Sequence, residues 1–415
     1  MVRKYVLLIP GLIIYLLYFF PAVVLAQEVV SYDTSSDKVV DLTDVIKKKL
    51  HKKTDSTKTK SPKSLAILPS LGYNPSFGFV IGAKASAIRQ YGKKEDTDLS
   101  AFGLEALYTS KGIITAQARH NVFTPGNKFN IQGNWQLSKY LITDYSIGTG
   151  NKDYVTNSDS AFLTKFGLVR LVEKVYRRIG RYWYIGGGLN FNIRSNIKEK
   201  KLDSLGSTPH YRYSQRNEFN PTKYSANGIM AAIEYNSKEH PLRAYKGIYA
   251  EFGFLFNQKW LGSTKNAFQI LYDLRKYVSL SSKNPEHVLA FWHIGSYKFG
   301  GSVPYLALPA TGYDTYSRSG RGYTIGRFKG LSYDYFESEY RFPITSNKLI
   351  SGVAFINLQT ASDDLGKKLF QYWDPAAGGG LRILLQKHSR STLCIDYAKG
   401  KYGSNGFFFG LNEVF

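Results

Sequence analysis

The residue types that carry most protein chemistry do not form a catalytic or metal-binding pattern in this chain. A single cysteine, Cys394, allows neither a disulfide framework nor a cysteine metal cluster. The histidines are scattered without ligand spacing, which favours solvated side chains. A hydrolase would need a serine, a histidine and an orienting Asn or Asp together, and the sequence indicates no such set. We therefore expect no enzyme, cofactor or metal. The seven histidines are His51, His120, His210, His240, His287, His293 and His388.

The most distinctive local motif is the glycine-rich stretch at residues 320–326, GRGYTIG. It superficially resembles a dinucleotide-binding loop, but the glycine spacing is wrong by one residue and no strand–turn–helix unit surrounds it. The stretch leads into an alternating segment that ends at Pro343. One face of that segment carries Phe336, Tyr340 and Phe342, and the other carries Glu337, Glu339 and Arg341. The question is therefore what lies on each side of such a segment.

Alternation with a period of two continues throughout residues 64–415. In one example Phe252, Phe254 and Phe256 alternate with Glu251 and Gly253. A soluble sheet buries one face, and a packed core would not tolerate so many charges there. We therefore predict an all-β fold, a transmembrane antiparallel barrel with lipid outside and a polar lumen inside.

About 16 such segments of about 10 residues follow one another, which is the length a tilted strand needs to cross a bilayer. The connections support this count, because the long ones follow odd-numbered strands and the short ones mostly follow even-numbered strands. This parity places Glu339 on the lumen face. The long connections are expected near residues 140–159, 195–223, 300–330 and 360–376. The expected strand starts are near residues 65, 77, 99, 112, 127, 160, 182, 224, 247, 266, 287, 331, 349, 377, 391 and 405.

Composition agrees with a membrane barrel. The chain has 415 residues, 15% of them aromatic, and its 32 tyrosines suit interfacial girdles. The formal net charge of +24 fits contact with lipid phosphates better than nucleic acid, because the basic residues gather at predicted connections.

The N-terminal 63 residues precede the barrel pattern. Residues 1–26 predict a signal peptide, with Arg3 and Lys4 before an apolar run and Ala26 at the cleavage site; a membrane anchor is the alternative. Residues 27–63 predict a polar periplasmic segment with one amphipathic helix, capped by Asp41. That helix could lie on the inner leaflet, plug the lumen or belong to a solvated tether. Its apolar face holds Leu42, Val45, Ile46 and Leu50.

Residues 320–344 and the C-terminal strands resemble the BamA/TamA-type bacterial surface antigen family of outer-membrane barrels. In that family a loop folds into the lumen and an Arg-Gly-Phe/Tyr tip locks onto acidic residues of the next two strands. The resemblance implies a loop lock made of Arg321, Gly322, Tyr323, Glu339 and Asn357, and Asn357 stands where the family usually has aspartate.

The last three strands, residues 377–415, also resemble this family. The resemblance implies a C-terminal insertion signal that assembly machinery reads, made of Phe407, Phe409, Leu411 and Phe415 on one face that Glu413 interrupts. Only 37 residues lie between Ala26 and Ser64, whereas each periplasmic polypeptide-transport (POTRA) domain needs some 75. The resemblance is therefore to a short, barrel-only branch that lacks these domains.

By resemblance we expect a Gram-negative outer-membrane protein that assists membrane biogenesis by inserting or translocating proteins or lipids. Its expected partners are outer-membrane lipids, outer-membrane proteins or lipids as clients, and the barrel-assembly machinery that inserts it. Two alternatives stay open, namely a passive pore or structural barrel without insertase activity, and an enzyme at the barrel rim.

Overall fold

The computed structural model describes residues 39–49, 64–74, 78–150, 162–315, 317–387 and 389–415. The expected signal peptide and most of the segment at residues 27–63 lie outside these ranges. Nearly all described residues belong to one compact unit, Val40–Phe415.

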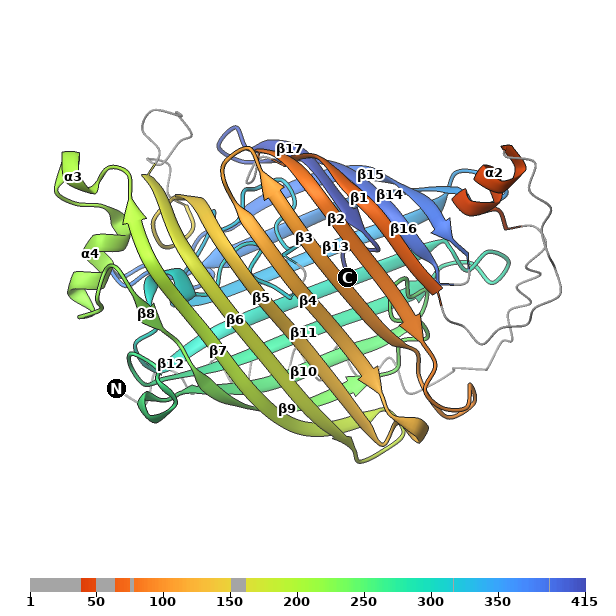
Figure 1. The fold of residues 1–415 in the computed structure, drawn as a ribbon, viewed down its shortest axis with the longest axis horizontal. Helices are drawn as coiled ribbons and strands as arrows, with labels where there is room; N and C mark the ends of the chain where they lie inside the picture. The colour runs from red at the N-terminus through yellow and green to blue at the C-terminus, as the bar shows by residue number, and fades with distance from the viewer. Residues whose placement is uncertain (1–38, 50–63, 75–77, 151–161, 316, 388) are drawn as a thin grey trace. The chain divides into compact units, whose positions relative to one another are not determined.

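The unit is an antiparallel sheet in which each strand pairs with the next one along the chain (Figure 1). The strands are β1 (Ser64–Asn74), β2 (Gly78–Arg89), β3 (Ser100–Thr109), β4 (Ile114–Phe123), β5 (Phe129–Asp144), β6 (Phe162–Arg178), β7 (Trp183–Glu199), β8 (Tyr224–Ser225), β9 (Gly228–Asn236), β10 (Gly247–Asn257), β11 (Ala267–Ser279), β12 (Val288–Gly301), β13 (Ser332–Pro343), β14 (Ile350–Ala361), β15 (Asp374–Gln386), β16 (Ser391–Gly400) and β17 (Asn405–Leu411). The helices are α2 (Leu42–Lys49), α3 (Leu202–Leu205), α4 (Pro209–Arg216), η4 (Pro125–Asn127), η5 (Lys259–Leu261) and η6 (Tyr305–Ala307).

Segments β8 and β9 are two parts of one strand, because both pair with β7. Between them the ladder is irregular: the Ala226 amide donates to the Asn192 carbonyl, and the Asn192 amide donates to Asn227 Oδ1. The chain therefore forms a nearly closed barrel of 16 strands, as predicted. Every strand starts within three residues of its predicted position. When β8 and β9 are counted as one strand, the long connections follow odd-numbered strands, as predicted.

The two ends of the sheet meet at a seam. Strands β1 and β17 lie next to each other, but among the described residues no ladder joins them. Side chains cross this region instead: Gln386 Nε2 donates to the Leu65 carbonyl at 3.1 Å, and Asn412 Nδ2 donates to Ser86 Oγ at 3.2 Å.

The outer face of the sheet is apolar and the inner face is polar, which is the reverse of the arrangement in a soluble protein. Apolar side chains such as Leu104 and Leu137 are 61% and 57% exposed on the outer surface, whereas Glu339 and Arg382 are fully buried inside. This arrangement is that of a transmembrane barrel with a polar interior. In the described part of the chain no helix has the length and apolar character needed to span a bilayer.

The connection at residues 302–331, which we call the lumenal loop, fills part of the interior. Its Tyr305 and Leu308 are fully buried in a cluster with side chains of β5 and β6 such as Phe166. Lys329 Nζ lies 3.1 Å from Asp144 Oδ1 at the end of β5. The predicted inward-folded loop is therefore present.

The predicted helix before the barrel is confirmed as α2, and Asp41 caps it by accepting the Asp44 amide at 2.9 Å. The Asp41 carboxylate also accepts the Lys387 amide at 2.9 Å in the turn between β15 and β16. The helix is thus attached to the end of the barrel that carries the short turns, and its role stays a prediction.

Candidate functional site: the anchored lumenal loop

The tip of the lumenal loop approaches the barrel wall closely enough to require glycine. Gly320 and Gly322 have φ angles of +79° and +102°, in the region that side chains disfavour. A Cβ on Gly322 would lie 2.7 Å from the Cβ of Ala376 on β15. These two glycines therefore allow the intervening Arg321 to point into the wall.

The Arg321 guanidinium is surrounded by three carboxylates. Its Nη2 lies 2.5 Å from both Glu337 and Glu339 on β13, and its Nη1 lies 2.8 Å from Asp396 on β16. The guanidinium carbon also sits 3.4 Å from the ring centroid of Phe355 on β14. Arg321 is 2% exposed, and Glu337 and Glu339 are fully buried. A buried charge cluster of this kind is stable only when every member keeps its partners.

Asn357 contacts the backbone of the loop tip. Its Nδ2 donates to the Arg321 backbone carbonyl at 2.9 Å. Glu337 and Asp396, which the resemblance does not include, supply further acceptors for the guanidinium. Asn357 therefore fixes the backbone of the loop tip and leaves the side chain to the carboxylates.

Tyr323 fixes the other side of the loop tip. Its hydroxyl donates to the Pro375 carbonyl at 2.6 Å and accepts the Lys401 amide at 2.9 Å. Its ring packs against Gly400 at the end of β16, where a Cβ would lie 2.5 Å from the ring. The arginine and the tyrosine together connect the loop tip to strands β13–β16.

The close contact between Tyr323 and Gly400 gives a testable prediction. Gly400→Ala should displace the tyrosine ring and lower the free energy of unfolding by about 1–3 kcal/mol, as overpacking does. The matched control is Gly103→Ala on β3, where a Cβ would meet nothing within 4 Å. Urea unfolding midpoints of the detergent-solubilised barrels would check this, and equal losses in both variants would contradict it.

A second arginine of the loop reaches the last strand. Arg318 Nη2 donates to the Leu411 carbonyl at 2.7 Å, and its Nη1 donates to the Asn412 carbonyl at 2.8 Å. The Asp314 carboxylate holds this turn by accepting the backbone amides of Arg318 and Ser319. The loop therefore contacts the strand that forms one side of the seam.

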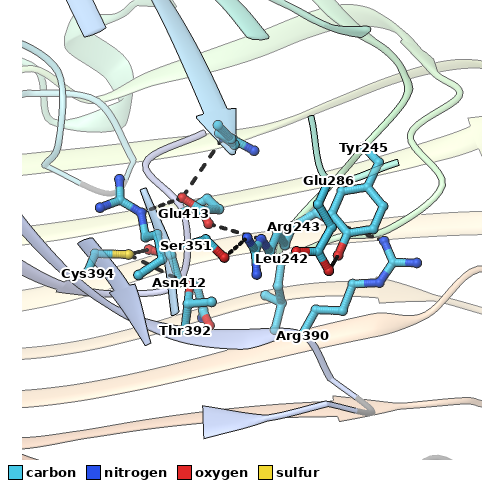
Figure 2. Close-up of polar contacts among 12 residues, drawn as sticks. Leu242, Arg243, Tyr245, Glu286, Ser351, Arg390, Thr392, Cys394, Asn412 and Glu413 are labelled. Carbon is cyan, nitrogen blue, oxygen red and sulfur yellow. Dashed lines mark hydrogen bonds and ion pairs between the residues drawn. The ribbon is translucent and has the colours of Figure 1, made fainter. Parts of the chain in front are cut away.

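The charge cluster continues from the loop tip toward the short-turn end of the barrel. Figure 2 shows Arg243 with Glu413 and Ser351 on one side and with Glu286 and Tyr245 on the other. Arg243 lies 3.3 Å from Glu413 and comes from the turn between β9 and β10. This turn therefore closes against the C-terminal residues inside the barrel.

Glu413 joins the two parts of this cluster. It lies 2.7 Å from Arg382 on β15 and 4.0 Å from Arg341 on β13. Burial alone would raise the pKa of Glu413, but the guanidinium groups of Arg382, Arg341 and Arg243 reverse this and lower the pKa. The carboxylate is therefore held ionised inside the barrel.

The residues of the expected C-terminal signal do not share one face. Phe407 and Phe409 are half exposed on the outside of β17, and Leu411 is half-buried at its end. The expectation for Phe415 was wrong, because Asn412 has a φ angle of +67° and turns the chain inward. Phe415 is buried and stacks on Trp292 with 5.2 Å between ring centroids.

Two partners of Arg321 were missed from the sequence although the alternation contained a signal for them. Glu337 is two residues from Glu339 and so lies on the same face of β13. Asp396 alternates with apolar residues on β16 and therefore also faces the lumen. The sequence could not show that Arg321 contacts these two carboxylates rather than others in the lumen, because that depends on where the loop folds.

A Ser–His–carboxylate arrangement does occur at the long-loop end. His210 Nδ1 lies 2.8 Å from Glu199 Oε1, and its Nε2 lies 3.4 Å from Ser214 Oγ and 3.1 Å from Tyr224 Oη. His210 and Ser214 are both fully buried, so a substrate carbonyl could not reach the serine without movement of α4. As folded, these contacts tie α4 to the barrel.

The comparisons with known proteins agree on the fold. No protein-family model matches the sequence, and no curated protein matches it. Among solved structures, BamA from Haemophilus ducreyi lacking POTRA domains 1-3 is similar at 15% identity and a TM-score of 0.54, over 86% of this chain and 70% of that chain. At these identities the similarity shows the fold alone.

Two CdiB barrels are also similar. CdiB from Acinetobacter baumannii has 10% identity and a TM-score of 0.51 over 84% of this chain and 59% of that chain. CdiB from Escherichia coli has 8% identity and a TM-score of 0.54 over 86% of this chain and 63% of that chain. This chain therefore spans less than two thirds of the length of either CdiB structure.

Proposed function

We propose that the protein is an integral barrel of the outer membrane that assists membrane biogenesis by inserting or translocating proteins or lipids. The observation that carries this proposal is the seam, where β1 and β17 lie side by side without a ladder between them. Unpaired strand edges are ready to accept another strand. In this role the lipids of the outer membrane surround the barrel, its clients are outer-membrane proteins or lipids, and the barrel-assembly machinery inserts it.

The lumenal loop supports the proposal from inside the barrel. Arg318 contacts the end of β17 and Arg321 contacts β13 and β16, so the strands beside the seam are held to the loop rather than to β1. The seam can then open while the remaining wall keeps its shape. The loop lock and the charge cluster around Glu413 are the parts that keep the wall rigid.

Depletion of the protein, followed by proteomic and lipid analysis of the outer membrane, tests the role. We expect an altered protein or lipid profile that the wild-type chain restores. As a matched control, Arg212→Ala on the exposed surface of α4 should restore it equally well. An unaltered profile after complete depletion would contradict a biogenesis role.

A passive pore is the second candidate, and the polar space inside the barrel favours it. The lumen holds a cavity of about 390 Å³ whose lining includes seven amide and eight charged side chains. Steady conductance of the purified protein in planar bilayers, together with an unaltered membrane profile after depletion, would support the pore. The absence of conductance in planar bilayers would argue against a pore.

A further inference from the structure

Glu173 on β6 is an exception to the apolar character of the outer face. It accepts a hydrogen bond at 2.9 Å from the indole nitrogen of Trp135, which is 47% exposed on the outer surface of β5. The next residue, Lys174, points the opposite way, because its Nζ lies 2.6 Å from Glu251 in the lumen. The Glu173 side chain is 37% exposed. A carboxylate that faces lipid is costly and therefore indicates a function.

A histidine and a glycine build a site around this carboxylate. The register places His120 on β4 opposite Gly133 on β5, and Gly133 opposite Glu173. A Cβ on Gly133 would lie 2.0 Å from His120 Cε1 and 2.6 Å from Glu173 Oε2. The glycine therefore leaves the space in which His120 Nε2 and Glu173 Oε1 approach to 3.0 Å across the intervening strand. We call His120 and Glu173 the outer-wall pair.

The outer-wall pair lies well inside the apolar band of the barrel. On β5 the outward residues from Phe129 to Leu137 are uncharged, and the exposed Lys139 is the next outward residue. At about 3.3 Å per residue and a tilt of about 45°, the stretch from Phe129 to Lys139 spans roughly 23 Å along the membrane normal, close to the usual band of about 25 Å. Gly133 then lies roughly 9 Å inside this band. Lipid at that depth is hydrocarbon, which offers no hydrogen bond to the pair.

Another carboxylate on the outer face shows how the protein can shield such a group by itself. Asp334 on β13 lies between two residues whose side chains pack inside the barrel, Tyr333 and Tyr335. It accepts the Tyr297 hydroxyl at 2.7 Å and lies 3.0 Å from His293 Nε2, and its side chain is only 3% exposed. The outer-wall pair lacks a comparable cover, since more than a third of the Glu173 side chain is open.

We propose that the outer wall of β4–β6 binds a second copy of this chain within the membrane, with the outer-wall pair at the centre of the contact. A carboxylate has about four lone-pair sites, and His120 and Trp135 occupy two of those on Glu173. Two copies related by a two-fold axis along the membrane normal hold their pairs at the same depth, so each carboxylate can meet the imidazole and indole groups of the other copy. The face is thus complementary to itself, and hydrogen bonds between such groups stabilise association in a bilayer.

Exposed apolar side chains surround the outer-wall pair and would complete the contact between the two copies. They are Leu137, Leu171, Val175, Ile185 and Leu189. The inference does not rest on the proposed role in membrane biogenesis, because it concerns the wall of β4–β6 and not the seam.

Photo-cross-linking in native membranes tests this proposal. Two copies of the full chain, each with a different affinity tag, are expressed together with Leu171 replaced by photoreactive benzoylphenylalanine. Leu171 is 41% exposed beside Glu173, so irradiation should give a dimer that carries both tags. The same group at Phe299, which is 49% exposed on β12 and packs against Phe268, reports random collisions and should give little dimer.

The His120→Gln/Glu173→Gln double variant should lower the dimer yield from the Leu171 position at least about fivefold. The matched control is Lys94→Gln/Glu95→Gln, which replaces two charged residues in an exposed turn and should leave the yield unchanged. Heat-modifiability on a gel would check that each variant folds.

Equal cross-linking from Leu171 and Phe299 would overturn the proposal, and so would an unchanged dimer yield in the double variant. Cross-links from Leu171 to other proteins alone would also overturn it, because they would assign this wall to a different partner. If the double variant does not fold, Glu173→Gln decides the outcome, and an undiminished dimer yield in that variant would contradict the proposal.

Discussion

Replacing Arg321 with alanine is expected to lower the free energy of unfolding of the barrel by about 3–5 kcal/mol. The change removes the only cation that contacts Glu337 within 4.0 Å among the described residues and leaves that carboxylate buried beside Glu339. Asp396 would still pair with Arg382, which lies 2.5 Å away. The uncompensated negative charge would therefore be mainly that of the carboxylates on β13. Unfolding midpoints and heat-modifiability on gels would measure this loss.

A compensating substitution makes the test of the loop lock sharper. Glu337→Gln in the Arg321→Ala background removes the uncompensated charge and should recover part of the lost stability. Arg212→Ala, on the exposed face of α4, serves as the control for loss of an arginine. An unchanged midpoint for Arg321→Ala would mean that the three carboxylates do not depend on the loop tip.

The barrel itself could be predicted closely from the sequence because a bilayer imposes a strict alternation. Each strand must present apolar side chains to lipid and can place charges only inside. Segments such as residues 247–257 therefore show their two faces without any knowledge of their neighbours. The parity of the long connections then supported the strand count, and it also placed Glu339 inside.

The contacts made inside the lumen could be predicted only in part. Alternation states that Glu337, Glu339 and Asp396 face inward, but not which of them a loop will meet. The meeting of Arg321 with Asp396 joins residues 75 positions apart across three strand pairings. Such contacts depend on the path of the lumenal loop. The sequence of this loop has no periodic pattern from which its path could be predicted.

The C-terminal residues show a different limit. A strand pattern that runs to the end of the chain predicts that Phe415 faces lipid with Phe407 and Phe409. One residue, Asn412, leaves the extended conformation, and the last three residues then turn into the lumen. The position of Glu413 explains this turn, because a buried carboxylate among arginines is stable where the same charge facing lipid is not.

The inward position of Phe415 predicts that its loss destabilises the folded barrel itself. Phe415 is 7% exposed, and its ring lies between those of Trp292 and Tyr277, with centroid distances of 5.2 and 6.2 Å. Its carbonyl also accepts a hydrogen bond from Arg341 Nη2 at 3.0 Å. Phe415→Ala should therefore lower the free energy of unfolding by about 3–5 kcal/mol, the usual cost of removing a buried ring.

This effect can be separated from a role in recognition by the assembly machinery. Refolding the urea-denatured protein into lipid vesicles without any machinery isolates the stability of the barrel. There Phe415→Ala should unfold at lower urea than the wild type, whereas Phe409→Ala, whose ring is 42% exposed on the outer face, should change the midpoint much less. Equal midpoints for wild type and Phe415→Ala, with defective assembly in cells, would leave the terminal ring with a signalling role only. A lowered midpoint would make the same residue an internal anchor that holds Glu413 among its arginines.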